Sequence, residues 1–279
     1  MHNSLFIFDL ETVPDTDAAK QLTGCDSNDV QELRQALAEY HLKVTDGRND
    51  FPRQPFHKIV AISFLEAEIE RDGPNEAYLL KELRSGGRVE ADEEELVKGV
   101  FQYLNRLKPR FVSFNGRNFD MPVLRFRAMK YGITAPWLYR SGDKWNNYQS
   151  RYSADWHCDL LDVLKDNGAM TGGLKLDEVA TILGLPGKTG VDGSQVSDMY
   201  DAGKLDEIRN YCETDVLNTY LVYLHHQHHT GVLKTADFAR AVQDVLTYID
   251  AEKVERPYLE EFFVAWEAAC GGKFISQED

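Results

Sequence analysis

The chain begins with a short apolar segment that ends in two carboxylates. Residues 4–10 read Ser-Leu-Phe-Ile-Phe-Asp-Leu, a composition typical of a buried β-strand. Asp9 and Glu11 are two residues apart, so in a strand their side chains point to the same face. Two adjacent carboxylates raise each other's pKa unless a cation lies between them. Such pairs are common on solvated surfaces, but a position at the end of an apolar strand favours a Mg²⁺ or Mn²⁺ site.

The predicted strands lie mostly in the first 115 residues and the predicted helices in the rest. Two more strands are predicted at 58–65 and 111–114, and a weaker, more exposed one at 67–79 with a turn at 72–74. Helices are predicted at 28–43, 93–107, 119–131, 174–183 and 206–227, with two more within 235–270. A boundary near Gly231 divides residues 1–230 from a helical extension, 231–279, expected to pack on the same domain.

Composition bounds the class of protein. An apolar fraction of 43% supports a folded core. The sequence has no apolar run of the length that spans a membrane and no signal peptide at its start, so we expect a cytoplasmic location. The four cysteines form no CxxC pair and are expected to be reduced. A net charge of −15 argues against a broad basic surface for long nucleic acid, but not against metal ions that hold a short strand end.

Three further residues complete an ordered set of four carboxylates and a phenol. Asp120 follows a predicted strand and falls in the first turn of a helix, with Asn118 as its expected N-cap. Tyr211 and Asp215 are four residues apart on one helix face, which continues through apolar Val222. Each of these can be an ordinary surface residue, but the whole set is what a two-metal phosphodiester hydrolase needs.

The ordered set resembles the DEDD superfamily of 3′–5′ exonucleases, in its tyrosine subclass. The motifs are Phe-Asp-Leu-Glu-Thr at 8–12, Phe-Asn-Gly-Arg-Asn-Phe-Asp at 114–120 and Tyr-Cys-Glu-Thr-Asp at 211–215. The histidine subclass carries His where this chain has Asn210. The Gly-Leu-Lys-Leu segment at 173–176 adds a likeness to the proofreading domain of family-B DNA polymerases. The resemblance covers about residues 4–225, and no polymerase domain accompanies it.

The resemblance implies an α/β, ribonuclease-H-like fold, with a mixed sheet of about five strands flanked by helices and extra C-terminal helices. It implies two divalent cations, Mg²⁺ or Mn²⁺, and removal of nucleoside 5′-monophosphates from single-stranded 3′ ends, DNA favoured over RNA. The implied metal ligands are Asp9, Glu11, Asp120 and Asp215, with Tyr211 as a further catalytic residue. The implied substrate contacts are Thr12, Asn115, Asn118, Phe119 and Lys175. A protein partner, the insertion at 15–58 and the C-terminal helices stay unassigned.

Three alternatives to a DNA exonuclease stay open. One is an exoribonuclease that acts on short RNA. Another is a phosphomonoesterase, because Asp9 can be a nucleophile, although that chemistry expects an Asp where this chain has Glu11. The third is a nucleic-acid-binding module without catalysis, against which the presence of all four carboxylates argues.

Several other features have a structural and a functional interpretation. Gly-Lys-Thr-Gly at 187–190 lacks the first glycine of a P-loop and is read as a turn, although Lys188 can reach a phosphate. The histidines at 225, 226, 228 and 229 have zinc-like spacing but are interpreted as charges at a helix end. Asp159 is interpreted as structural and Asp162 as solvated. Arg125 and Arg127 are phosphate contacts or salt-bridge residues. The aromatic run at 137–152 stacks on bases or packs in the core.

Overall fold

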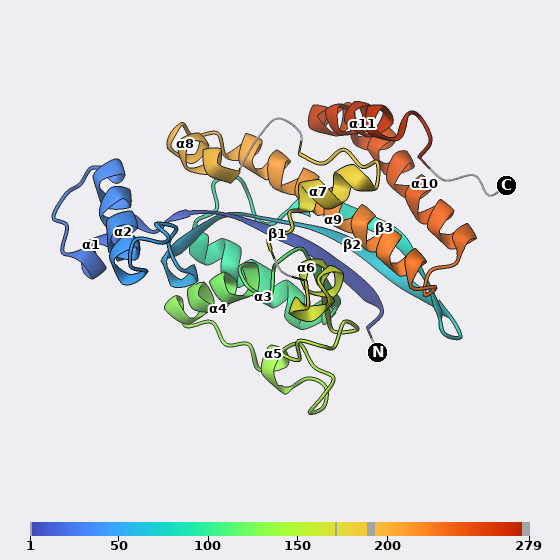
Figure 1. Cartoon of the computed structure of the whole chain (residues 1–279), viewed down its shortest axis with the longest axis horizontal. Coiled ribbons are helices and arrows are strands. Elements are labelled where there is room, and N and C mark those ends of the chain that lie inside the picture. The colour runs from blue at the N-terminus through green and yellow to red at the C-terminus, as the bar shows by residue number, and fades with distance from the viewer. Residues whose placement is uncertain (1, 171, 189–192, 275–279) are drawn as a thin grey trace.

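A five-stranded mixed sheet forms the centre of the molecule (Figure 1). The computed structural model describes residues 2–170, 172–188 and 193–274. The strand order is β3-β2-β1-β4-β5, in which β1 pairs antiparallel with β2 and parallel with β4. The strands are β1 (Ser4–Pro14), β2 (His57–Asp72), β3 (Asn75–Ser85), β4 (Arg110–Ser113) and β5 (His157–Asp159). This arrangement is the ribonuclease-H-like α/β fold that the sequence predicts.

The central strand β1 is buried on both faces, and its residues alternate between two cores. Leu5 and Ile7 belong to the core formed with α9, α10 and α11. Phe6 and Phe8 point the other way, into the core formed with α3 and α4. Since successive side chains of a strand point to opposite faces, Asp9 and Glu11 share the face of Leu5 and Ile7. The apolar half of the strand therefore directs both carboxylates toward the α9 side of the sheet.

Helices cover the two faces of the sheet as separate layers (Figure 1). On one face, α9 packs across β1, β2 and β3, while α10 packs on β3 and α11 contacts both α9 and α10. On the other face, α3 and α4 pack against β2 and each other. The helices are α1 (Thr16–Thr23), α2 (Val30–Val44), α3 (Glu93–Leu107), α4 (Asp120–Lys130), α5 (Pro136–Arg140), α6 (Leu160–Leu164), α7 (Leu176–Ile182), α8 (Val196–Asp201), α9 (Leu205–His229), α10 (Thr235–Glu252) and α11 (Pro257–Cys270).

The insertion after the first motif forms two helices that lie at one end of the molecule (Figure 1). Asp15 and Asp29 cap the N-termini of α1 and α2 by accepting hydrogen bonds from backbone N–H groups. Arg34 of α2 forms a two-pronged ion pair with Asp201 of α8, with Nη1 2.6 Å and Nη2 2.8 Å from the carboxylate oxygens. This ion pair therefore joins the insertion to α8.

The structure corrects several expectations from the sequence. The strand predicted to end near residue 65 continues to Asp72, because β1 and β3 pair with it on both sides and a register shift at Glu66–Ala67 absorbs the irregularity. The predicted helix at 93–107 is confirmed at the same residues. The division at residue 230 stays a prediction, while α10 and α11 pack against the preceding elements.

Of its two interpretations, Arg127 takes the salt-bridge role, and it does so as a buried residue. The side chain is buried, and its guanidinium pairs with Asp15, 2.5 Å away, and with Glu93. Tyr131 donates to the same Glu93 carboxylate at 2.6 Å. A buried guanidinium between two carboxylates is not available to a substrate phosphate. In the described part of the chain, no helix is both long and apolar enough to cross a membrane.

Candidate active site

The first two carboxylates lie where β1 extends beyond its parallel neighbour. The pairing of β1 with β4 covers Leu5 to Ile7, after which β4 ends and the chain turns toward α4. On its other edge β1 stays paired with β2, and a register shift falls between Glu11 and Thr12. Irregularities of this kind re-aim side chains and are common beside active sites. Asp9 is half-buried and Glu11 is buried.

Asp120 completes the β1 edge that β4 leaves open. Its Oδ1 accepts a hydrogen bond from the backbone N–H of Leu10 at 3.1 Å. The carboxylate therefore takes the place of the neighbouring strand that β1 lacks beyond β4. It binds the N–H group of Leu10, the residue between Asp9 and Glu11 in the chain. Gly116 keeps this approach open, since a Cβ there would lie 2.5 Å from Ser113 Oγ and 3.4 Å from Asp120 Oδ2. Phe119, not Asn118, occupies the N-cap position of α4, which corrects the expected cap.

Helix α9 carries the third motif to the same strand end. Cys212 Sγ lies 3.5 Å from the carbonyl oxygen of Asp9 and 3.7 Å from its Oδ2. Tyr211 is buried and Asp215 half-buried, and the face they share continues into buried Val222, as predicted. A hydrogen bond to Asp215 helps to raise the pKa of Tyr211, after burial and the charge of that carboxylate. The phenol and the carboxylate therefore lie next to each other beside β1.

Burial and neighbouring carboxylates shift the pKa values of this site. Burial, followed by the charges of Asp120, Glu11 and Asp215, raises the pKa of Asp9 well above its usual range. Burial and the charges of Asp215 and Asp120 do the same to the pKa of Glu11, which the charge of Lys188 partly offsets. Burial raises the pKa of Asp120 to about 7, against the opposing effect of its backbone hydrogen bonds. This is the electrostatic pattern of a site that needs a cation.

The donor set fits hard divalent cations. The described residues contain one group of three candidate ligand atoms within 4.8 Å of one another, from Asp9, Glu11 and Cys212. Burial and the neighbouring carboxylates raise the pKa of Cys212, so the thiol stays protonated and donates to Asp9. The ligands that remain are carboxylate oxygens, which Mg²⁺ and Mn²⁺ prefer.

The predicted substrate contacts divide into two groups. Thr12, Asn115, Asn118 and Phe119 flank the carboxylates along the chain, whereas Lys175 lies exposed at the start of α7. Within the described residues the Lys175 side chain makes no hydrogen bond or ion pair to the four carboxylates. The Gly-Lys-Thr-Gly segment lies partly outside the described residues, and the backbone N–H of Lys188 donates to Asp177 at 2.8 Å.

The loop before α4 has a fixed conformation. Asn115 has a left-handed backbone, φ 70°, and its Oδ1 accepts a hydrogen bond from Asn118 Nδ2 at 3.0 Å. Asp159 holds this loop by accepting from the N–H groups of Asn115, at 2.9 Å, and Arg117, at 2.7 Å. Asp159 is thus structural, as interpreted from the sequence. Asp162 is buried and paired with Arg151 at 2.5 Å, which corrects its predicted solvation.

Sequence reasoning missed His57, which joins the insertion to the first two motifs. Its Nδ1 lies 2.9 Å from Thr12 Oγ1, and its ring packs edge-on against Phe119, with centroids 4.9 Å apart. Phe51 packs on both rings at the tip of the insertion and is 56% exposed. The only signal in the sequence is that His57 opens an apolar strand. Its partners are too distant along the chain to be inferred.

A second missed feature is a chain of hydrogen bonds behind the site. Arg256 and Tyr258, at the start of α11, both donate to Glu213. Ser85 Oγ donates to the other oxygen of Glu213 at 2.7 Å, and the hydroxyls of Ser85 and Ser63 are 2.8 Å apart. Ser63 pairs with Asp9 across the sheet. The C-terminal helices are thus joined to the turn of α9 that carries the third motif.

The remaining candidates are structural. The rings of His225 and His228 pack on Phe238, with centroids 5.0 and 4.8 Å away, and the four histidines form no metal-binding group within the described residues. In the aromatic run, Trp137 and Tyr148 are buried in the core, whereas Tyr139, Trp145 and Tyr152 are exposed. The four cysteines are free, as expected.

Fold and site together define a nuclease of the ribonuclease-H-like class. A model of predicted 3′–5′ exonucleases related to the exonuclease domain of PolB matches residues 49–266, most of the chain. The chain therefore belongs to this family, and its substrate is nucleic acid. Family membership implies dependence on metal ions. The matched range begins after Asp9 and Glu11, which the structure joins to it through the central strand. No curated protein matches the chain.

Proposed function

We propose that this exonuclease is of the tyrosine subclass and removes nucleoside 5′-monophosphates, one at a time, from the 3′ ends of single-stranded DNA. The observation that carries the proposal is the convergence of four carboxylates from β1, α4 and α9 beside a buried phenol, close enough that the charges of Asp120 and Asp215 raise the pKa values of Asp9 and Glu11. DNA is favoured over RNA because the family is related to the exonuclease domain of PolB. RNA is the alternative substrate.

Two ions, Mg²⁺ or Mn²⁺, suit the oxygen donors of this site. Asp9, Glu11 and Asp215 would hold the ions through their carboxylate oxygens. Asp120, whose Oδ1 accepts from the Leu10 N–H, would support them from the neighbouring helix. When bound, the ions lower the pKa of that water and offset the charge that develops on the phosphate and the leaving oxygen.

Tyr211 is proposed to orient the attacking water. Its hydroxyl lies beside Asp215, and its raised pKa keeps the phenol protonated at neutral pH. A protonated phenol positions the water by hydrogen bonding and does not remove its proton. Hydrolysis adds the water oxygen to phosphorus and breaks the bond from phosphorus to the 3′ oxygen. That oxygen takes a proton, which leaves a 3′-hydroxyl on the shortened strand.

A gel assay on 5′-labelled DNA and RNA oligomers with Mn²⁺ tests the proposal. The expected result is a ladder that shortens by one nucleotide at a time, more rapid on DNA, with no cutting of closed circular strands. Asp215→Asn removes a proposed ligand, while Asp206→Asn changes an exposed residue of the same helix and is the matched control. A ladder of equal rate from Asp215→Asn contradicts the site assignment, and cleavage of the circle indicates an endonuclease.

A further inference from the structure

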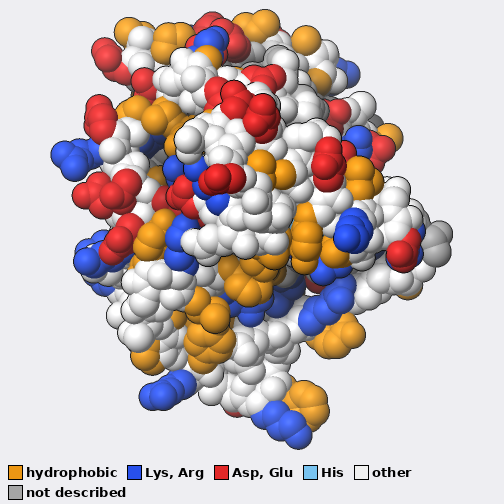
Figure 2. Space-filling view, turned by 90° about the vertical axis from the view of Figure 1, so that its left-hand side faces the viewer, with side chains coloured by type: hydrophobic (Ala, Val, Ile, Leu, Met, Phe, Trp, Pro, Cys, Tyr) orange, Lys and Arg blue, Asp and Glu red, His pale blue; other side chains and the backbone are white. Residues whose placement is uncertain are grey.

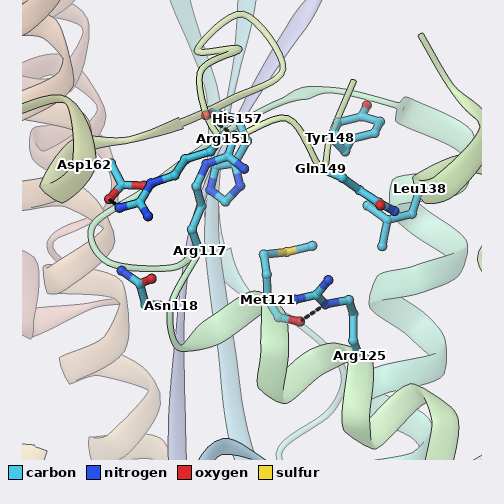
Figure 3. A pocket seen from close by; sticks show the side chains of 10 residues that line it. All are labelled: Arg117, Asn118, Met121, Arg125, Leu138, Tyr148, Gln149, Arg151, His157 and Asp162. Atoms are coloured by element: carbon cyan, nitrogen blue, oxygen red, sulfur yellow. Dashed lines mark hydrogen bonds and ion pairs between the residues drawn. The ribbon is translucent and has the colours of Figure 1, made fainter. Parts of the chain in front are cut away.

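A cavity of about 220 Å³ opens beside the second motif (Figure 3). Arg117 comes from the loop before α4, Arg125 from α4 itself, and Arg151 from the segment before β5. Figure 3 shows Arg117 and Arg151 close to His157 on one side of the cavity, and Arg125 beside Met121 on another. Three separate parts of the chain thus bring guanidinium groups to one cavity.

Two of these arginines have no carboxylate partner within the described residues. Arg117 Nη2 donates to the backbone carbonyls of Ser150, at 3.0 Å, and His157, at 2.7 Å, while its Nε is buried without a hydrogen-bond partner. The Arg125 side chain makes one hydrogen bond in the described structure, from Nε to the Met121 carbonyl at 3.2 Å. Guanidinium groups fit phosphate oxygens particularly well.

The opposite part of the cavity is apolar. Met121 and Leu138 are buried side chains that line it, and Tyr148 adds a ring whose hydroxyl is already used to donate to the Pro109 carbonyl at 2.9 Å. The volume is below the roughly 300–1,000 Å³ of pockets that enclose drug-sized ligands. Cationic and apolar walls in a small cavity suit one phosphate together with part of its nucleoside.

The cavity lies close to Asp120, one of the four carboxylates. His157 lines it and is hydrogen-bonded through Nε2 to Ser113 Oγ at 2.7 Å. Ser113 Oγ in turn packs against Gly116, next to the Asp120 carboxylate. Arg117 and Met121 both lie within three residues of Asp120 in the sequence. A strand whose 3′ end lies at the carboxylates can therefore reach this cavity within a few nucleotides.

The distribution of charge on the face shown in Figure 2 suits a bound nucleic-acid strand. In Figure 2 the acidic side chains gather in the upper half of the face, while the lower half carries mostly basic and hydrophobic side chains around a hollow. The two views share a vertical axis, and in Figure 1 α4 and α5 lie in the lower half of the molecule. Charge is thus separated locally even though the whole chain is acidic.

We propose that this cavity binds an internal phosphate of the substrate strand, upstream of the nucleotide being removed, with Arg117 and Arg125 as its ligands. The proposal rests on the exonuclease function proposed above. Its consequence is selection by length: a strand long enough to fill the cavity binds better than a dinucleotide. Arg151 also lines the cavity, but its charge is paired with Asp162, so it is not among the proposed ligands.

Kinetics on two kinds of substrate test the proposal. Oligothymidylates of two to ten nucleotides report on the cavity, whereas the p-nitrophenyl ester of thymidine 5′-monophosphate needs only the metal site. In the unmodified enzyme, kcat/KM should rise with length. Arg125→Gln should lower kcat/KM on the octamer, relative to the ester, by about 10-fold or more, mainly through KM. Arg140→Gln, an exposed arginine of α5 outside the cavity, should keep the ratio.

Binding measurements separate this proposal from the catalytic one. A fluorescein-labelled octamer with Ca²⁺ should bind Arg125→Gln about 10-fold more weakly than the unmodified enzyme, while a labelled dinucleotide should show little difference. Equal octamer affinity and equal length dependence in the two proteins overturn the cavity assignment but leave the exonuclease intact. Octamer binding that depends on Arg125, without hydrolysis of any substrate, supports the cavity and overturns the exonuclease. In a further outcome, Arg125→Gln weakens inhibition by free thymidine 5′-monophosphate but leaves the dependence on substrate length unchanged. The cavity then holds the product and not an internal phosphate, which also overturns the proposal.

Discussion

Replacing Asp120 by Asn should stabilise the metal-free protein. Burial raises the pKa of this carboxyl from 3.8 to about 7, so its charged form is disfavoured in the folded state. Because the folded state holds this proton more tightly than the unfolded state, the metal-free protein loses stability as pH rises from 3.8 through 7. Above pH 7 the full loss of stability is present. Three pKa units correspond to about 4 kcal/mol. Asn is neutral and can still accept the Leu10 N–H, 3.1 Å away, so the fold keeps that hydrogen bond.

Thermal unfolding in EDTA measures the effect. At about 2 °C per kcal/mol, Asp120→Asn should melt about 8 °C above the unmodified protein at pH 8. At pH 5 the native carboxyl is mostly protonated, so the gain should fall to less than half. Mg²⁺ should stabilise the unmodified protein more than the variant, because the ion offsets the same charge. Asp50→Asn, at an exposed position, is the matched control. A variant that melts at or below the unmodified protein in EDTA at pH 8 would refute the reasoning.

Three further predictions follow from the site and the fold. Tyr211→Phe should lower kcat by about 10- to 1000-fold with little change in the Mg²⁺ concentration for half-maximal rate, measured on labelled oligomers; an unchanged rate means that the ring only packs against the sheet. Excess EDTA should abolish hydrolysis because the four carboxylates repel the substrate phosphate, and undiminished cleavage in EDTA contradicts the two-metal assignment. Arg127→Met should lower the free energy of unfolding by about 3–5 kcal/mol, because Asp15 and Glu93 lose their buried partner; urea denaturation measures this, and a smaller loss on adding Glu93→Gln confirms the coupling.

The candidate catalytic residues could be proposed from the sequence because their signals are local. Asp9 and Glu11 follow an apolar strand, and Tyr211 and Asp215 are one helical turn apart, so short-range periodicity already puts each pair on one face. The helix at 93–107 was predictable for the same reason, since its apolar residues recur at helical spacing. The likeness to a nuclease family then rests on the order of these motifs, and the family match supports it.

Burial and partners were not predictable for the charged residues outside the motifs. Asp162 and Arg127 have charged side chains, which are usually exposed, yet both are buried in ion pairs. No pattern along the chain indicates their partners. The strand at 57–72 was predicted as two pieces because its outer half is polar. Pairing with β1 and β3 on both sides makes it continuous.

From the sequence alone we predict the candidate site: four carboxylates and a phenol, whose order and spacing resemble those of a metal-dependent nuclease. Only the tertiary structure decided how those groups are held and what surrounds them. It brings Asp120 to the free N–H of Leu10, sets a protonated Cys212 against Asp9, and joins Arg117 and Arg125 around a cavity. The physical reason is that motifs depend on neighbours along the chain, whereas desolvation, hydrogen bonding and charge pairing depend on neighbours in space.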